Sequence, residues 1–279
     1  MISFISFGSG SSGNCYYLHN GACGILIDAG ISARTLKRYF IEYGLRRDIV
    51  RCILVTHDHA DHVKYVGKIS SDLAIPVYAT SKVHDGIERN YCVHKKIEPR
   101  WRCIMRKGGT IKVGGGEGPG VTSFDVPHDS SDNVGYKIEW EGLTLCLITD
   151  AGHVTSAMEA NISSSDYLII EANHDEQMLA RGNYPEYLKQ RISSPVGHMS
   201  NKTCAQALVD NASARLRHVW LCHLSQENNH PELARLTVET ALRRHGRGDI
   251  KVDVLRRNAV CGVYALAAGE PDKQYATLF

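Results

Sequence analysis

Short apolar runs rich in β-branched and aromatic residues recur along the whole chain, and most have the length of a β-strand. Segments with helical periodicity lie between many of them. Strand-like runs dominate the first third, and strands alternate with helices again in the second half. This pattern predicts an α/β (α+β) fold in which two β-sheets pack face to face with helices on their outer faces. We expect helices over residues 32–43, 61–72, 155–160, 175–190, 201–213 and 231–245.

The chain has no internal repeat and no low-complexity linker. Its 279 residues fit one domain, and we predict a single domain over 1–279. The glycine-rich segment GGGEGPG at 114–120 predicts a hairpin or loop tip. Ser200 is a suitable N-cap for the helix over 201–213, so His198 would lie just before a helix N-terminus, where backbone N–H groups favour an anion.

The composition is that of an ordinary globular protein, with 43% hydrophobic and 22% charged residues. A net charge of +2 means that any affinity for nucleic acid must come from a local patch. We find no signal peptide and no apolar stretch that could span a membrane. Nine cysteines without CxxC spacing suggest reduced, mostly buried thiols. These features predict a cytoplasmic protein.

The segment THDHADH at 56–62 places three histidines and two aspartates directly after the apolar run CILV. His57 and His59, two residues apart at a strand end, can converge on one metal ion. Asp61 and His62 begin the following helix and can face a second ion. Imidazole and carboxylate ligands together suit Zn, Mn or Fe better than Ca or Mg alone. A set of ordinary polar loop residues is the alternative, which five ligand-type residues at this spacing make improbable.

Three further apolar strands each end in one ligand-type residue. These residues are His128 in FDVPHDSSD, Asp150 in LITDAGH and His223 in VWLCHLS. Each alone would be an unremarkable loop residue. Strand ends that converge are how a sheet scaffold builds a rigid metal site, so we expect all three beside THDHADH.

These motifs, in this order, resemble those of the metallo-β-lactamase fold hydrolases, and Asp28 in ILIDAG matches the early structural aspartate of that family. The resemblance implies an αβ/βα sandwich with the active site at one edge. It also implies two divalent ions, Zn²⁺ or Mn²⁺ with Fe as an alternative, and a metal-bridging hydroxide as nucleophile. The implied ligands are His57, His59 and His128 for the first ion, Asp61, His62 and His223 for the second, and Asp150 between them.

The chain resembles the nuclease branch of this fold more than the β-lactamases, which commonly use a cysteine ligand. LIIEANHD and GHMSNKTCAQAL are similar to the paired motifs of tRNA 3′-processing enzymes, which implies that Glu171 and His198 assist proton transfer to the leaving group. Asp61 is also assigned a catalytic role. Only 20 residues separate Asp150 from Glu171, which leaves no room for a β-CASP insertion.

Nearly end to end, the sequence resembles the bacterial WalJ (YycJ) family, on motifs that include FGSGSSGNCYYL, PHDSSDNVGYKIE and YPEYLKQRISSPVGHMSN. That resemblance implies a metal-dependent 5′→3′ exonuclease on double-stranded DNA, with links to DNA repair and cell-wall regulation. An RNA-processing nuclease, or a small-molecule phosphodiesterase of the cyclic-nucleotide type on the same site, is the alternative. A non-enzymatic metal-binding regulatory module is a third reading.

Several residues are candidates for contact with the substrate. Basic and aromatic residues interleave in ARGNYPEYLKQR, which suits a nucleic-acid surface, although a solvated charged face is the plainer interpretation. RWRCIMRK at 100–107 and RRHGRG at 243–248 are further basic clusters. We expect His153 to support the metal ligands from behind. The predicted contact residues are Asn14, His174, Ser225, Arg181 and Lys189.

Overall fold

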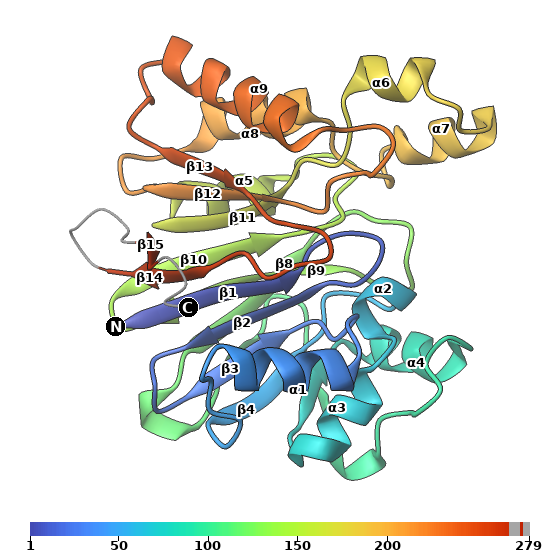
Figure 1. Ribbon diagram of the computed structural model, residues 1–279, viewed down its shortest axis with the longest axis vertical. Coiled ribbons are helices and arrows are strands. Elements are labelled where there is room, and N and C mark those ends of the chain that lie inside the picture. Colours follow the sequence, from blue (N-terminus) through green and yellow to red (C-terminus); the bar gives the residue numbers. More distant parts are fainter. Residues whose placement is uncertain (268–273, 276–279) are drawn as a thin grey trace.

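The computed structural model describes residues 1–267 and the short strand at 274–275. Two β-sheets pack face to face, and helices cover both outer faces (Figure 1). The strand order is β15-β14-β1-β2-β3-β4-β5-β6 in the first sheet and β13-β12-β11-β10-β9-β8-β7 in the second. This architecture confirms the predicted αβ/βα sandwich.

Both sheets are mixed, and each contains a run of parallel strands. In the first sheet β3, β4, β5 and β6 are parallel, and in the second β10, β11, β12 and β13 are parallel. The first sheet consists of β1 (Ile2–Gly8), β2 (Cys15–His19), β3 (Gly24–Ile27), β4 (Val50–Leu54), β5 (Val77–Ala79), β6 (Arg102–Ile104), β14 (Val263–Leu266) and β15 (Gln274–Tyr275). The second consists of β7 (Thr110–Lys112), β8 (Gly120–Asp125), β9 (Val134–Trp140), β10 (Leu143–Ile148), β11 (Tyr167–Glu171), β12 (His218–Cys222) and β13 (Lys251–Val254).

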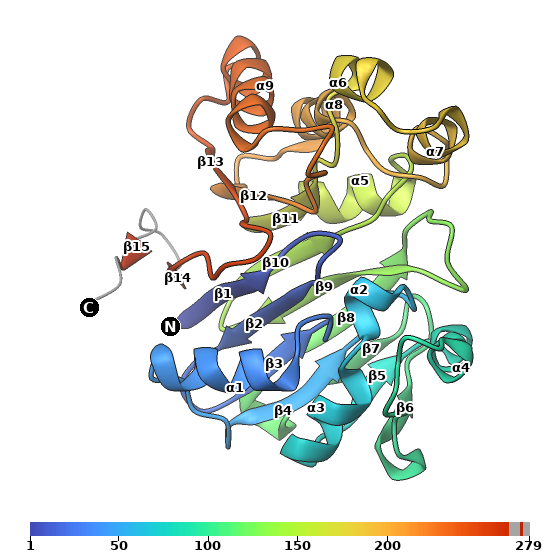
Figure 2. The same ribbon diagram turned by 45° about the vertical axis from the view of Figure 1, so that its right-hand side comes forward.

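The helices divide between the two outer faces. The first sheet carries α1 (Ala33–Glu42), α2 (Ala60–Val63), α3 (Val66–Leu73) and α4 (Ser81–Arg89). The second carries α5 (Ser156–Ser163), α8 (Asn201–Asn211) and α9 (Pro231–Arg244). Two short helices, α6 (Glu176–Arg181) and α7 (Glu186–Ile192), stand away from the sheet at one end of the sandwich (Figure 2). Within the described residues, no helix is long and apolar enough to cross a membrane.

Most predicted helices occur within a few residues of their expected ends, but two predictions were wrong. The segment 61–72 forms two helices, because the N–H of Tyr65 leaves the helical pattern and donates to the carbonyl of Ala29, 3.0 Å away. The segment 175–190 is also split, at 182–185, where Gly182 and Pro185 end one helix and start the next. Helix α4 was not predicted at all. The glycine-rich segment joins β7 to β8 in a hairpin, as predicted.

Three apolar layers hold the sandwich together. The layer between the sheets contains large buried side chains such as Phe4, Tyr136 and Trp220. The other two layers lie between each sheet and its helices. Seven of the nine cysteines are buried, as predicted, and therefore act as small apolar residues of these layers.

Three loops at one edge of the sandwich touch through their backbones. The N–H of Gly30 donates to the carbonyl of Asn14 (2.9 Å), and the N–H of Asn14 donates to the carbonyl of Asp61 (2.8 Å). A Cβ at Gly30 would lie 1.6 Å from the Asp61 carbonyl oxygen. Only glycine therefore lets the loop after β3 approach the start of α2 this closely.

We expect Gly30→Ala to destabilise the protein by about 3 kcal/mol, because neither neighbouring backbone can yield without losing its hydrogen bonds. Urea unfolding measures the change. The matched control is Gly116→Ala, since nothing lies within 4 Å of a Cβ at that position. Equal stability of the two variants would contradict the close approach at Gly30.

Candidate metal centre

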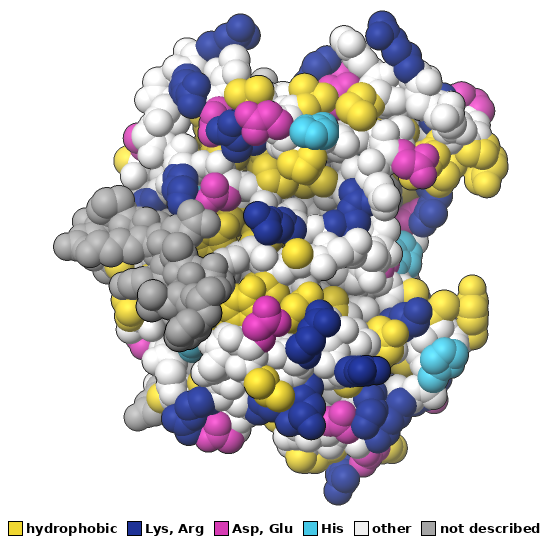
Figure 3. All heavy atoms as spheres, in the orientation of Figure 1, with side chains coloured by type: hydrophobic (Ala, Val, Ile, Leu, Met, Phe, Trp, Pro, Cys, Tyr) yellow, Lys and Arg dark blue, Asp and Glu magenta, His cyan; other side chains and the backbone are white. Residues whose placement is uncertain are grey.

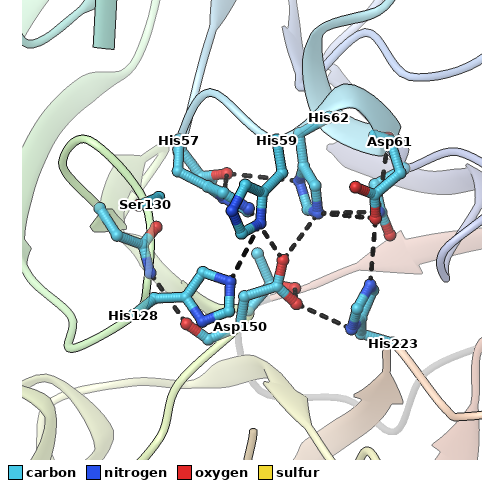
Figure 4. A network of polar contacts seen from close by, with 12 residues as sticks. His57, His59, Asp61, His62, His128, Ser130, Asp150 and His223 are labelled. Atoms are coloured by element: carbon cyan, nitrogen blue, oxygen red, sulfur yellow. Dashed lines mark hydrogen bonds and ion pairs between the residues drawn. The ribbon is translucent and has the colours of Figure 1, made fainter. Parts of the chain in front are cut away.

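Five strands end at the same edge of the sandwich, and each is followed by a polar side chain. Asp28 follows β3, and His57 follows β4. His128, Asp150 and His223 come within three residues of the ends of β8, β10 and β12. The histidine and aspartate side chains labelled in Figure 4 follow strands of both sheets and point toward a common centre. The three ligand-type residues that we predicted at separate strand ends therefore do lie beside THDHADH.

Three histidines form one side of this centre. The ring centroids of His57, His59 and His128 lie 4.8 to 5.1 Å apart. His128 Nε2 is 3.2 Å from His59 Nδ1. One nitrogen from each ring can be chosen so that all three lie within 4.8 Å of one another. Such a set can hold a single metal ion.

Asp150 joins these histidines to a second group. Its Oδ2 lies 3.1 Å from His57 Nε2 and 2.8 Å from His62 Nε2. Its Oδ1 lies 2.8 Å from His223 Nδ1. Asp61 completes the second group, because its Oδ2 is 3.3 Å from His223 Nε2 and 3.4 Å from His62 Nε2.

Hydrogen bonds behind the histidines fix which ring nitrogen faces the centre. His62 Nδ1 donates to Asp28 Oδ2 (2.7 Å). The Thr56 hydroxyl donates to Asp28 and can therefore accept from His57 Nδ1, 3.0 Å away. His128 Nδ1 donates to the carbonyl of Gly197 (3.0 Å). Nε2 of each of these three rings thus faces the centre, which is how proteins orient histidine ligands.

The donor set fits a divalent metal ion. His57 is fully buried, and its Nε2 makes no hydrogen bond although Asp150 Oδ2 lies nearby. Burial holds the pKa of His57 well below its usual value and also lowers that of His128, which favours the neutral rings that a metal ion takes. Burial would also lower the pKa of His62 and His223, but the carboxylates of Asp150 and Asp61 raise it. Burial alone would raise the pKa of Asp150, but His223 and His62 beside it hold that pKa well below its usual value. Neutral imidazoles and an ionised carboxylate are the ligands that such ions take.

Three of these residues adopt the left-handed backbone conformation, which side chains other than glycine rarely take. Their φ angles are +60° at Asp28, +52° at Asp150 and +53° at His223. Each stands within two residues of a strand end, so the turn directs the side chain of Asp150 or His223 into the centre and that of Asp28 onto His62. Strain of roughly 1–3 kcal/mol per residue is typical of functional sites held by the surrounding fold.

Glu171 and His198 lie together at the edge of the centre. His198 Nδ1 is 2.7 Å from Glu171 Oε1, and the other oxygen of Glu171 accepts from the N–H groups of Ala151 (2.9 Å) and Met199 (3.1 Å). Burial alone would lower the pKa of His198, but the Glu171 carboxylate raises it above its usual value. The predicted pair is therefore brought together, with Glu171 fully buried and His198 partly exposed.

A cleft of about 380 Å³ opens beside the centre. His198, His223 and Ser225 line it, so Ser225 lies where the sequence analysis expected a contact residue. Figure 3 shows the surface indented between α7 and α4, with a histidine side chain at the indentation. The site is therefore open to solvent at one edge of the sandwich.

The other predicted contact residues lie outside this cleft. Asn14 is fully buried, and its amide lies 3.1 Å from Asp61 Oδ2 and 2.8 Å from His62 Nε2, so in this structure it contacts two residues of the centre instead of lining the cleft. His174 is buried too, and its carbonyl accepts from the N–H of Asn201. Arg181 is exposed at the end of α6, and Lys189 donates to the carbonyl of Ala180, which joins α7 to α6. Contact of these residues with a substrate stays a prediction.

His153 lies beside the loop that follows α7, since its Nδ1 donates to the carbonyl of Pro195 (2.7 Å). Two other residues near the site were not predicted from the sequence. Asp129 accepts from Arg191 Nε (2.5 Å), which ties the His128 loop to α7. Arg257 reaches the cleft from the connection between β13 and β14. A signal for Asp129 was its position next to His128, whereas nothing around Arg257 in the sequence marks it.

We expect Asp28→Asn to weaken metal binding by roughly 10–100-fold, because the amide offers one acceptor oxygen to donors that now share two. Competition with a chelator measures the affinity. Asp48→Asn is the matched control, since the Asp48 side chain is exposed and pairs with the nearby Arg46. An unchanged affinity in a folded Asp28→Asn protein would show that Asp28 does not orient the ligands.

Comparisons with known proteins agree with this geometry. Residues 24–223 match the family described as Beta-lactamase superfamily domain. The exodeoxyribonuclease YycJ of Bacillus anthracis is 35% identical over 247 residues, which cover 88% of this chain and 91% of that protein. The exodeoxyribonuclease WalJ of Streptococcus pneumoniae is 34% identical, with 88% of this chain and 90% of that protein covered.

Among solved structures, the metallo-β-lactamase fold protein YhfI of Bacillus subtilis has a similar fold. Its TM-score is 0.68 at 14% identity, with 94% of this chain and 99% of that chain covered. At this identity the similarity concerns the fold alone. The match to the superfamily and the two relatives above 30% identity decide the family. The chain belongs to the beta-lactamase superfamily and, within it, to the family of the YycJ and WalJ proteins.

Proposed function

We propose that this protein is a metal-dependent phosphodiesterase that degrades double-stranded DNA as a 5′→3′ exonuclease. One observation carries the proposal. Asp150 joins two groups of possible metal ligands, and a cleft opens beside these groups and the Glu171–His198 pair. Relatives at 34 and 35% identity are named exodeoxyribonucleases, which supports DNA as the substrate. A DNA substrate would also fit the cytoplasmic location that the sequence predicts.

The proposal assigns two divalent ions, Zn²⁺ or Mn²⁺, to the two ligand groups. His57, His59 and His128 would hold the first ion. Asp61, His62 and His223 would hold the second, and the two oxygens of Asp150 would serve both. Bound divalent ions supply positive charge that offsets the charge of the phosphodiester, together with a water molecule of lowered pKa.

His198 is proposed as the acid that protonates the leaving oxygen. Its Nδ1 is held by Glu171, so its Nε2 is left for the substrate on the side that lines the cleft. The Glu171 carboxylate raises the pKa of His198, which favours the protonated ring that a proton donor requires. Glu171 is itself fixed by two backbone N–H groups, so it acts as a positioning residue for His198.

The surface around the cleft supports binding of a polyanion. Tyr184, Arg191 and Arg257 line the cleft. Arg181 is exposed on α6, the helix that precedes α7 with its Arg191, and is a proposed contact to the DNA backbone. Ser225, which lines the cleft, is a proposed contact closer to the metal centre. Aromatic and basic side chains together suit a nucleic acid.

We expect metal-stripped protein supplied with Mn²⁺ or Zn²⁺ to release nucleotides from the 5′ ends of end-labelled duplex DNA. Asp61→Asn should lower this rate at least roughly 100-fold, because it removes a charged metal ligand. A gel assay with the label at one end or the other reports the polarity. Asp72→Asn is the matched control, because Asp72 is paired with Lys68 on the outer face of α3.

Undiminished cleavage by purified Asp61→Asn protein would overturn the assignment of the site. Absence of DNA cleavage by the wild-type protein, together with rapid turnover of a cyclic nucleotide, would instead support a small-molecule phosphodiesterase. The size of the cleft would allow such a substrate.

We expect Glu171→Gln to lower kcat about 100-fold and to move the alkaline limb of the pH–rate profile to lower pH. Glutamine can keep both backbone bonds with its oxygen, but it turns an N–H toward His198 Nδ1 and removes the charge that raises the pKa of His198. The His198 ring then loses its proton at a lower pH. A pH profile of kcat on duplex DNA tests this, and an unshifted alkaline limb would contradict the role of His198 as acid.

A further inference from the structure

Two chain segments that are distant in sequence meet beside the metal centre: the loop after β1 and the connection between β13 and β14. The N–H of Ser9 donates to the carbonyl of Arg256 (3.0 Å), and the Ser12 hydroxyl donates to the side chain of Asn258. The Ser9 hydroxyl in turn accepts from the N–H of His223 (3.0 Å). The two segments are therefore held in a fixed position relative to a proposed metal ligand.

Arg257 lies at this junction and is a half-buried cation without a counter-charge. Its guanidinium donates to the Gln226 side chain (2.9 Å) and to the carbonyl of Leu224 (2.9 Å), both of which are neutral. Within the described chain no carboxylate forms an ion pair with it, although Glu227 lines the same cleft. A Cβ at Gly10 would come within 2.9 Å of Arg257 Cγ, so the stem of the side chain packs closely against the loop after β1. A cation placed in this way is suited to an incoming anion.

The loop after β1 adds further donors beside Arg257. Ser11 and Ser12 are the central residues of a turn closed by the bond from the Gly13 N–H to the Gly10 carbonyl (2.9 Å). In the part of the chain that the structure describes, the N–H groups of Ser11 and Ser12 donate to no acceptor, and both residues line the cleft. Free backbone N–H groups in a turn are a common feature of phosphate sites.

The same cleft reaches the reaction centre at its other end, where His198 and His223 line it. Its volume of about 380 Å³ is near the lower limit for small-molecule sites, so it suits one nucleotide better than a length of duplex. Figure 3 shows basic side chains over the connection between β13 and β14. The donors at Arg257 and the metal centre would therefore contact two different phosphate groups of one bound strand.

We propose that Arg257, with the backbone N–H groups of Ser11 and Ser12, binds the phosphate on the 5′ side of the scissile one, which in an exonuclease is the terminal 5′-phosphate. This proposal rests on the proposed exonuclease function and makes it more specific. The protein is then selective for duplex ends that carry a 5′-phosphate. Arg257 contributes to substrate binding and takes no part in proton transfer.

The test compares duplexes of one sequence that end in a 5′-phosphate or a 5′-hydroxyl, with kcat/KM measured on both in the presence of Mn²⁺. For the wild type we expect a preference for the phosphate of roughly tenfold or more, from hydrogen bonds to a charged group. Arg257→Gln should reduce this ratio to near one, mainly through KM on the phosphorylated end. Both values of kcat/KM are measured on the same variant, so a partial loss of folded or metal-loaded protein lowers both equally and leaves their ratio unchanged.

Arg256→Gln is the matched control. Arg256 is the exposed neighbour of Arg257, and its substitution removes the same charge outside the cleft. It should keep the wild-type ratio. Active wild-type protein without a preference for the phosphate, or an Arg257→Gln protein that keeps the preference, would overturn the subsite. Wild-type protein that cleaves neither duplex would overturn the proposed exonuclease function itself, and the subsite with it.

Discussion

The burial of ionisable side chains at one edge of the sandwich is the constraint on which the site depends. Asp28, Asp150 and Glu171 have almost no exposure, and a buried carboxylate is costly unless donors surround it. Each of the three is met by imidazole or backbone N–H groups. These donors come from loops that only the strands of two sheets can bring to one place. The buried carboxylates of the centre therefore depend on the packing of the two sheets.

The sequence allowed the cluster of histidine and aspartate side chains to be predicted because the signal there is local. An apolar strand followed by one histidine or aspartate is visible without any knowledge of the partner strands, as at Asp150 and His223. The resemblance to a known family, which the comparisons confirm, then supplied the order of the motifs. The sandwich was predicted on the same basis, since period-two and helical patterns are also local.

What the sequence did not reveal depends on contacts between distant segments. The break between α2 and α3 arises where Tyr65 bonds to Ala29, and no local pattern marks that choice. Arg257 meets the first loop of the chain across more than 240 residues, so its place in the cleft follows only from the packing of β13 and β14. The burial of Asn14 has the same origin, because the partners that enclose it are Asp61 and His62.

The centre draws its side chains from both sheets: His57, His59, Asp61 and His62 follow a strand of the first sheet, and His128, Asp150 and His223 follow strands of the second. A metal ion bound there would act as a staple across the sandwich. Its binding energy would add to the folding energy by mass action, about 2.7 kcal/mol when the free ion is at 100 times its dissociation constant. Lack of the metal ion would then abolish the activity and also make the protein more susceptible to proteases. The cellular amount of the protein would therefore depend on the supply of the ion.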